Sequence, residues 1–150
     1  IFNRTGLELS AAQQKAALWK EKIPIDGLDA VGRALEIFYR YSAFPQDEPL
    51  DLKPFKHAVE KAPDSFMSHD LMGWAYYRQT DYANAGHSFR KALTINPNGA
   101  GVMAGLMWCG VFTRNWEETS YWSARKADVC DKDVAKAKEK ARQRFEKHAK

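Results

Sequence analysis

The side chains that could support catalysis or hold a metal are four histidines, two cysteines and scattered carboxylates in a chain of 150 residues. His69 beside Asp70 has the residue types of an oriented general base, but no nucleophile stands in a recognisable motif. The histidines and cysteines show no HExxH, CxxC or other metal-ligand spacing. No pair of carboxylates has a spacing that calls for acid–base catalysis, and there is no phosphate-binding glycine loop. The sequence therefore predicts no catalytic residue, no metal site and no cofactor, and the chain is expected not to be an enzyme.

The helices that would position these side chains are clearest in the middle of the chain. Apolar residues recur at three-and-four spacing from Met67 to Tyr76, and again from Tyr82 to Ile95. Residues 79–81 between them are too few for anything but an antiparallel turn. Pro97 ends the second helix, because the residue before a proline is pushed out of the helical region. Two packed amphipathic helices are predicted, with His69 at a packing position of the first.

The same stretch, from Asp64 to Asn98, resembles a tetratricopeptide repeat, which is a 34-residue helix-turn-helix unit. We call the length of this unit the repeat period. His69 departs from the pattern, because it stands where tryptophan is usual. One such unit cannot bury its own apolar face, so related units are expected on both sides. The resemblance implies an all-α fold, a right-handed solenoid of about three repeats. The motif residues are Met72, Gly73, Tyr76, Ala85, Phe89, Ala92 and Pro97.

Weaker copies of the repeat are predicted on both sides of the central unit. Upstream, residues 28–63 form a degenerate repeat whose second helix begins near Leu52, with Asp51 as its cap. Downstream, residues 98–130 form another, with helices over 101–113 and 116–129. Asn115 follows Asp81 by one repeat period, whereas Leu106 follows Leu71 by one residue more than the period. Together with the central unit, residues 64–97, these repeats predict a single tetratricopeptide-like domain over residues 1–150.

The two ends of this domain are predicted to be helices that cover the repeats. Residues 1–27 contain a capping-box pattern ahead of a helix over 11–22. Residues 131–150 carry eight Lys or Arg and four Asp or Glu, so they account for the whole net charge of +4. We interpret them as a polar capping helix. An anionic partner for this basic segment stays an alternative, and nucleic acid is disfavoured because residues 1–130 are neutral.

The two cysteines give an indication of the cell compartment in which the chain is found. Cys109 and Cys130 are predicted to lie ~12 Å apart on antiparallel helices, beyond the ~7 Å reach of a disulfide. Free thiols favour a reducing compartment such as the cytoplasm. The chain begins with Ile rather than Met, which fits a processed chain or a fragment, so a periplasmic location with a removed anchor stays open. No stretch is apolar enough to predict a membrane span.

The resemblance also implies where a partner binds, because the first helix of each repeat lines the concave face in similar proteins. In the central unit this predicts a groove of Met67, Asp70, Trp74, Tyr77 and Arg78. The third unit would add Val102, Gly105, Cys109 and Phe112, and the first Leu35, Phe38 and Tyr39. Asp70 and Trp74 stand where related co-chaperones use basic and amide residues to hold acidic tails, so that kind of ligand is disfavoured.

The function predicted from these residues is non-catalytic binding of a peptide or partner segment in an aromatic groove, as an interaction scaffold. Residues 28–63 and 96–119 are also similar to repeat segments attached to bacterial nucleotide cyclases and transcriptional regulators. The alternative is therefore a ligand-responsive or coupling domain of a larger signalling enzyme or regulator. Coverage of Trp74 and Tyr77 by the terminal helix or by a second copy, as a homo-oligomer, is a further alternative.

Overall fold

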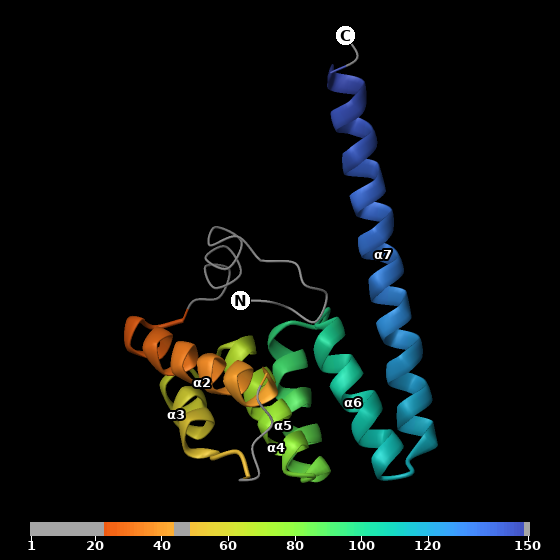
Figure 1. Ribbon diagram of the computed structural model, residues 1–150. Helices are drawn as coiled ribbons and strands as arrows, with labels where there is room; N and C mark the ends of the chain where they lie inside the picture. The colour runs from red at the N-terminus through yellow and green to blue at the C-terminus, as the bar shows by residue number, and fades with distance from the viewer. Residues whose placement is uncertain (1–22, 44–48, 149–150) are drawn as a thin grey trace.

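The computed structural model describes residues 23–43 and 49–148 of the chain (Figure 1). This part consists of helices and connecting turns, with no strand, which confirms the all-α prediction. The predicted N-terminal helix over 11–22 lies outside the described residues. The helices are α2 (Ile25–Ala43), α3 (Lys53–Lys61), α4 (Phe66–Arg78), α5 (Tyr82–Ile95), α6 (Ala100–Phe112) and α7 (Trp116–His148).

The helices pack as three hairpins in chain order, α2 with α3, α4 with α5, and α6 with α7. The hairpins also touch one another, since α3 contacts α4 and α5 contacts α6. The first helix of the central hairpin contacts the first helix on each side, so α2, α4 and α6 form one row (Figure 1). This side-by-side arrangement is the helical-hairpin repeat predicted from the sequence.

The hairpin turns after α4 and α6 have the same geometry. Thr80 has φ 61° and Arg114 has φ 57°, so each helix ends in a left-handed residue that is not glycine. The next residue then caps the following helix: the Asp81 carboxylate accepts from the Asn84 amide at 3.2 Å, and Asn115 Oδ1 accepts from the Glu118 amide at 3.2 Å. The two turns are therefore separated by one repeat period, without an insertion or a deletion.

The core along the hairpins consists of two clusters, in which alanines and aliphatic residues pack around two phenylalanines. One cluster joins α2, α3 and α4, and includes Val31, Phe55 and Leu71. A second joins α5 and α6 around Phe89 and Leu106. Phe55 and Phe89, which are one repeat period apart, are both completely buried. The aromatic motif position of the first two units therefore has the same packing role.

The first hairpin departs slightly from its predicted boundaries. Helix α2 begins at Ile25, three residues before the predicted start of the repeat. Helix α3 begins at Lys53, so the residue at the capping position is Leu52 and not the predicted Asp51. Asp51 lies one residue earlier, where its Oδ1 accepts from the Lys53 amide at 3.0 Å. Proline at the second position of α3 is tolerated because the first helical amides need no intrahelical acceptor.

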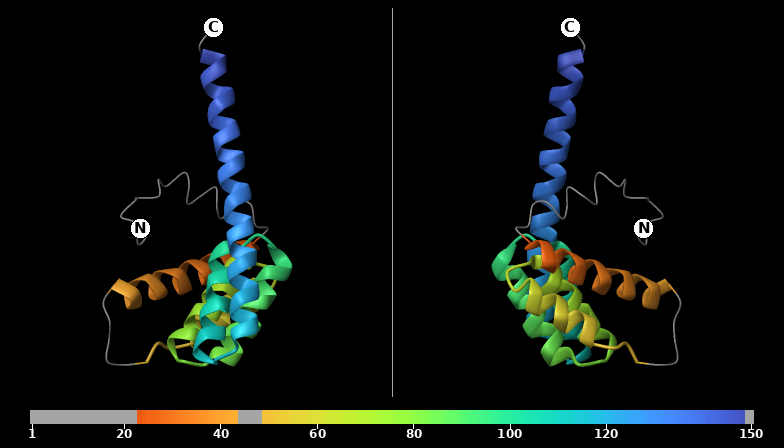
Figure 2. Two further views of the ribbon diagram at one scale, coloured as in Figure 1. Left: turned by 90° about the vertical axis from the view of Figure 1, so that its right-hand side faces the viewer. Right: turned by 90° about the vertical axis from the view of Figure 1, so that its left-hand side faces the viewer.

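The prediction of a separate capping helix over 131–150 is wrong. Helix α7 runs without a break from Trp116 to His148, and its second half extends past the other helices in every view (Figures 1 and 2). The 33 residues span ~50 Å, against ~20 Å for α6. Residues 129–134 contain neither glycine nor proline, and Lys132 pairs with Asp128 at 2.8 Å across the predicted break. Residues 131–136 are exposed, so this segment does not cover the core.

Candidate partner-binding site

The surface formed by α4 and α6 depends on how these two helices pack around Phe89. A methyl group added at Gly73 would lie 2.5 Å from the Phe89 ring, and one added at Gly105 would lie 2.6 Å from it. The ring of α5 is thus held between a glycine of its own hairpin and a glycine of the next. Because only glycine leaves room for the ring on each side, this contact fixes the rotation of α4 and α6 about their axes.

The rotation of α6 corrects the predicted register of the third unit. The prediction aligned α6 with α4 at a spacing one residue longer than the repeat period. It therefore placed Val102, Gly105 and Cys109 in the groove, although Val102 is completely buried and Cys109 is only 6% exposed. These residues belong to the core. The buried positions Ser68, His69, Leu71, Met72 and Ala75 of α4 recur one repeat period later as Val102, Met103, Gly105, Leu106 and Cys109 of α6.

The surface positions of α6 that correspond to the predicted groove of α4 follow from the same spacing. Trp108 is 44% exposed and Phe112 is 54% exposed. Of the residues predicted in the third unit, only Phe112 is on the surface. Trp108 is the site residue that the sequence reasoning missed, and the spacing of the two hairpin turns was the signal for it. One repeat period after Met67, Asp70, Trp74, Tyr77 and Arg78 stand Gly101, Ala104, Trp108, Val111 and Phe112, each at least partly exposed.

Aromatic side chains of α4, α5 and α6 define a surface that we call the aromatic face, and four of its five rings contact one another. It consists of Trp74 and Tyr77 from α4, Tyr82 from α5, and Trp108 and Phe112 from α6. Tyr82 stacks on Phe112 with ring centroids 5.1 Å apart and planes 6° apart. Tyr77 lies edge-on to Phe112 at 6.0 Å, and Trp74 lies edge-on to Tyr77 at 5.4 Å. Trp108 is one helical turn before Phe112, so both project from the same side of α6.

The rings of the aromatic face are more buried at Trp74 than at Phe112. The indole of Trp74 lies 5.1 Å from the Phe89 ring and is half-buried, so it is shared between the surface and the core. Burial raises the pKa of Tyr77, with smaller raising effects from Tyr82 and Cys109 and a lowering effect from Arg78. The Tyr77 hydroxyl thus stays a neutral hydrogen-bond donor throughout the neutral pH range.

Polar residues border the aromatic face. Met67, Asp70 and Arg78 lie on the same helix, and the guanidinium of Arg78 donates to the Ser42 hydroxyl at 3.4 Å. This bond joins the end of α4 to the end of α2. Of the first-unit residues predicted for the groove, Tyr39 is 39% exposed, whereas Leu35 and Phe38 pack partly against the core.

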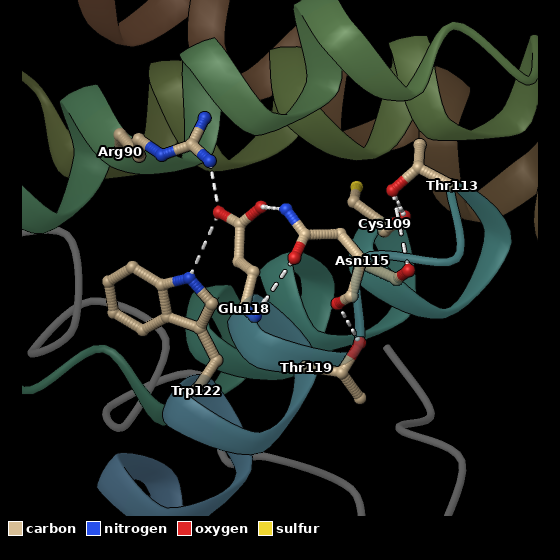
Figure 3. Close-up of polar contacts among 8 residues, drawn as sticks. Arg90, Cys109, Thr113, Asn115, Glu118, Thr119 and Trp122 are labelled. Atoms are coloured by element: carbon tan, nitrogen blue, oxygen red, sulfur yellow. Dashed lines mark hydrogen bonds and ion pairs between the residues drawn. The ribbon is translucent and has the colours of Figure 1, made fainter.

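A polar network fixes α7 against the preceding hairpin (Figure 3). The Glu118 carboxylate accepts from Arg90 of α5, from Asn115 Nδ2 at 3.3 Å and from Trp122 Nε1 at 3.3 Å. Close contact between α6 and α7 requires Gly110, since a methyl group there would lie 2.5 Å from Thr119 Oγ1. The network therefore has a structural role, because it joins α5 to the first turns of α7.

His69 and the two cysteines, which could support catalysis or bind a metal, do not come together as a metal-binding group in the described residues. His69 is 6% exposed and its Nε2 lies 2.6 Å from the Pro63 carbonyl oxygen, as its predicted packing position implies. Both cysteines are free in this structure, Cys109 buried and Cys130 exposed. Among the residues that the structure describes, no three His, Cys, Asp or Glu side chains group as metal ligands. No helix in the described ranges combines the length and apolar character needed to cross a membrane.

The fold and the connected hairpins define a helical-repeat protein. The family model of the tetratricopeptide repeat matches residues 67–98, so the central hairpin is a tetratricopeptide repeat, as the motif predicted. A comparison with curated proteins finds no match to this chain. Tetratricopeptide repeats are protein-interaction units and are typically non-catalytic, which assigns the chain a general role in protein–protein interaction.

Proposed function

We propose that the chain is a non-catalytic interaction module whose aromatic face binds an apolar segment of a partner protein. The observation that carries the proposal is the exposure of Trp108 and Phe112 on one side of α6, where Phe112 also contacts the rings of Tyr77 and Tyr82. Large aromatic side chains that stay exposed next to one another commonly mark a binding surface. The proposed contact residues are Met67, Asp70, Trp74, Tyr77, Arg78, Tyr82, Trp108 and Phe112.

The geometry of the rings suits an extended or helical peptide with aromatic or aliphatic anchors. Tyr82 and Phe112 are stacked, and Tyr77 supports both, so little side-chain freedom is lost when a partner binds. Tryptophan, tyrosine and arginine are the residues that most often dominate binding free energy at interfaces. Arg78 and Asp70 at the border would set the orientation of the segment through their charges.

A peptide-display selection tests this proposal. The intact chain is used as the bait, and selected peptides are then measured against Trp108→Ala/Phe112→Ala. We expect binding to fall by at least about 30-fold, since the loss of even one of the two anchors commonly costs ~2 kcal/mol. Tyr121→Ala is the matched control, because Tyr121 is also an exposed aromatic residue but lies on α7. Selected peptides that bind the double variant as tightly as the intact chain would show that the face is not the site.

A further inference from the structure

A cavity of about 230 Å³ lies between α3 and α5, with α4 as its floor. It is lined by residues of the first and second hairpins, and none of them belongs to the aromatic face. Its volume is below that of pockets for drug-sized ligands, which start at ~300 Å³. The cavity therefore suits a small chemical group rather than a large ligand.

The cavity is explained by the residue at which this repeat departs from its family pattern. His69 lines the cavity at the position where the tetratricopeptide motif usually has tryptophan. An imidazole is much smaller than an indole, and the bond of Nε2 with the Pro63 carbonyl holds the ring in place. The substitution leaves space in the packing between α3 and α5 and makes the floor of that space polar.

Two polar side chains lie in the interior of the cavity, and the Nε2 of one of them, His69, is already bonded to the Pro63 carbonyl oxygen. His69 and Ser88 are each only 6% exposed, so the cavity has an imidazole and a hydroxyl in its interior. Asn84 and His87 of α5 lie at its wall. A lining with polar side chains favours a polar occupant over an apolar one.

The charge of the lining is positive on both sides. Lys56 of α3 and Lys91 of α5 line the cavity, and its lining contains no carboxylate. Within the described part of the chain, neither lysine forms an ion pair. Glu60, one turn after Lys56, has its carboxylate 3.8 Å from His57 Nδ1. Two unpaired ammonium groups near a desolvated polar floor produce a positive potential that favours an anion.

From these contacts we infer that the cavity binds a phosphate-sized dianion, either free phosphate or the phosphoryl group of a phosphomonoester. The two lysines supply charge-assisted hydrogen bonds from opposite walls, and the Ser88 hydroxyl supplies a neutral donor. The Asn84 side-chain amide already donates one hydrogen bond to Asp81 Oδ2 at 2.7 Å, so it has one N–H left for the anion. This site is independent of the aromatic face, so it adds a second ligand to the proposed interaction module.

Titration of the isotope-labelled intact chain with inorganic phosphate, at constant ionic strength with chloride as the reference, tests the site by NMR. We expect saturable shifts at the amides of His69 and Ser88. Lys56→Gln/Lys91→Gln should weaken binding by about tenfold or more, because charge-assisted contacts are lost on both walls. Lys53→Gln/Lys61→Gln is the matched control, since it removes two exposed charges of α3 outside the cavity and should leave binding unchanged.

A second variant, His69→Trp, restores the usual residue of the motif and fills the cavity. It should stay folded, as shown by an unchanged dispersion of amide signals, and should lose phosphate binding. A parallel titration with phosphoserine identifies the source of the phosphoryl group, because tighter binding than free phosphate indicates a modified side chain. The inference is overturned if phosphate gives no saturable shift, or if the cavity variant and the control variant bind equally well.

Discussion

At the scale of single residues, Phe89 determines the packing of the central repeat. Its ring lies against Gly73 and Gly105, at distances where an added methyl group would overlap it. Gly73→Ala should destabilise the fold by about 1–3 kcal/mol, because the buried ring has no room to move. Gly32→Ala is the control. Gly32 is also inside a helix, but a methyl group there meets nothing within 4 Å, so this change should stabilise by about 0.5–1 kcal/mol. Urea denaturation measures both, and equal effects of the two would contradict the packing described.

The two cysteines should differ in reactivity. Burial raises the pKa of the Cys109 thiol from 9.0 to about 11, with a further raising effect from Glu118 and a lowering one from Arg90. At pH 8 about one Cys109 in a thousand is then a thiolate. Reaction with DTNB at pH 8 should label one thiol of the folded chain rapidly and the second only on unfolding. Cys130→Ser should abolish the rapid phase, and rapid labelling of that variant would show that Cys109 is accessible.

The raised pKa of Cys109 also makes the free energy of unfolding depend on pH. The folded state keeps the proton up to about pH 11, whereas the unfolded thiol loses it near the ordinary value of 9.0. The Cys109 thiol therefore makes its full contribution to the stability of the folded state below pH 9, and this contribution is lost as the pH rises from 9 to 11.

The site residues also show what the sequence could predict. Trp74, Tyr77 and Phe112 were identified from the repeat motif, and the structure places all three in one group of rings. Val102 and Cys109 were assigned to the surface because an apolar pair, Leu106 and Met107, was aligned with Leu71 and Met72. Helix α6 is apolar on all sides, so its composition does not reveal which face is buried. The capped turns at Asp81 and Asn115 fix the register, because caps occupy a defined position in the helix.

At the scale of elements, α7 is the helix that differs most from its prediction. Its first half takes the place of the second helix of a repeat, but the residue one repeat period after Phe89 is Ser123, which is exposed. Helix α7 therefore has, at this position, no buried aromatic residue like Phe89, the residue through which α5 packs against the next hairpin. The continuity of α7 could not be predicted from apolar periodicity, because a short stripe of apolar residues is equally consistent with packing and with exposure.

Removal of residues 137–150 tests the position of α7. The free energy of unfolding should change by less than ~0.5 kcal/mol, because that part of the helix extends beyond the other helices (Figure 1). Far-UV circular dichroism should lose the signal of about three helical turns, as ~3.6 residues form one turn. If residues 137–150 covered the core instead, the same deletion would lower the melting temperature markedly.

At the scale of the whole molecule, the sequence was sufficient to predict a helical-hairpin array with its strongest repeat in the centre, and the family match at residues 67–98 confirms that repeat. The array has two distinct surfaces with different residues. The aromatic face gathers rings from α4, α5 and α6, and the polar cavity lies between α3 and α5. The cavity was not predictable from the motif alone, because it needs both the smaller residue at position 69 and the two lysines that different helices bring to it.

The central claim, that partners bind at the aromatic face, is tested most directly by affinity capture from a lysate of the source organism. Three baits are compared: the intact chain, Trp108→Ala/Phe112→Ala, and Tyr121→Ala, each checked for an unchanged melting temperature. If partners bind at the aromatic face, a protein should be retained by the intact chain and by Tyr121→Ala and lost with the double variant. Equal retention of the same proteins by all three baits would contradict it.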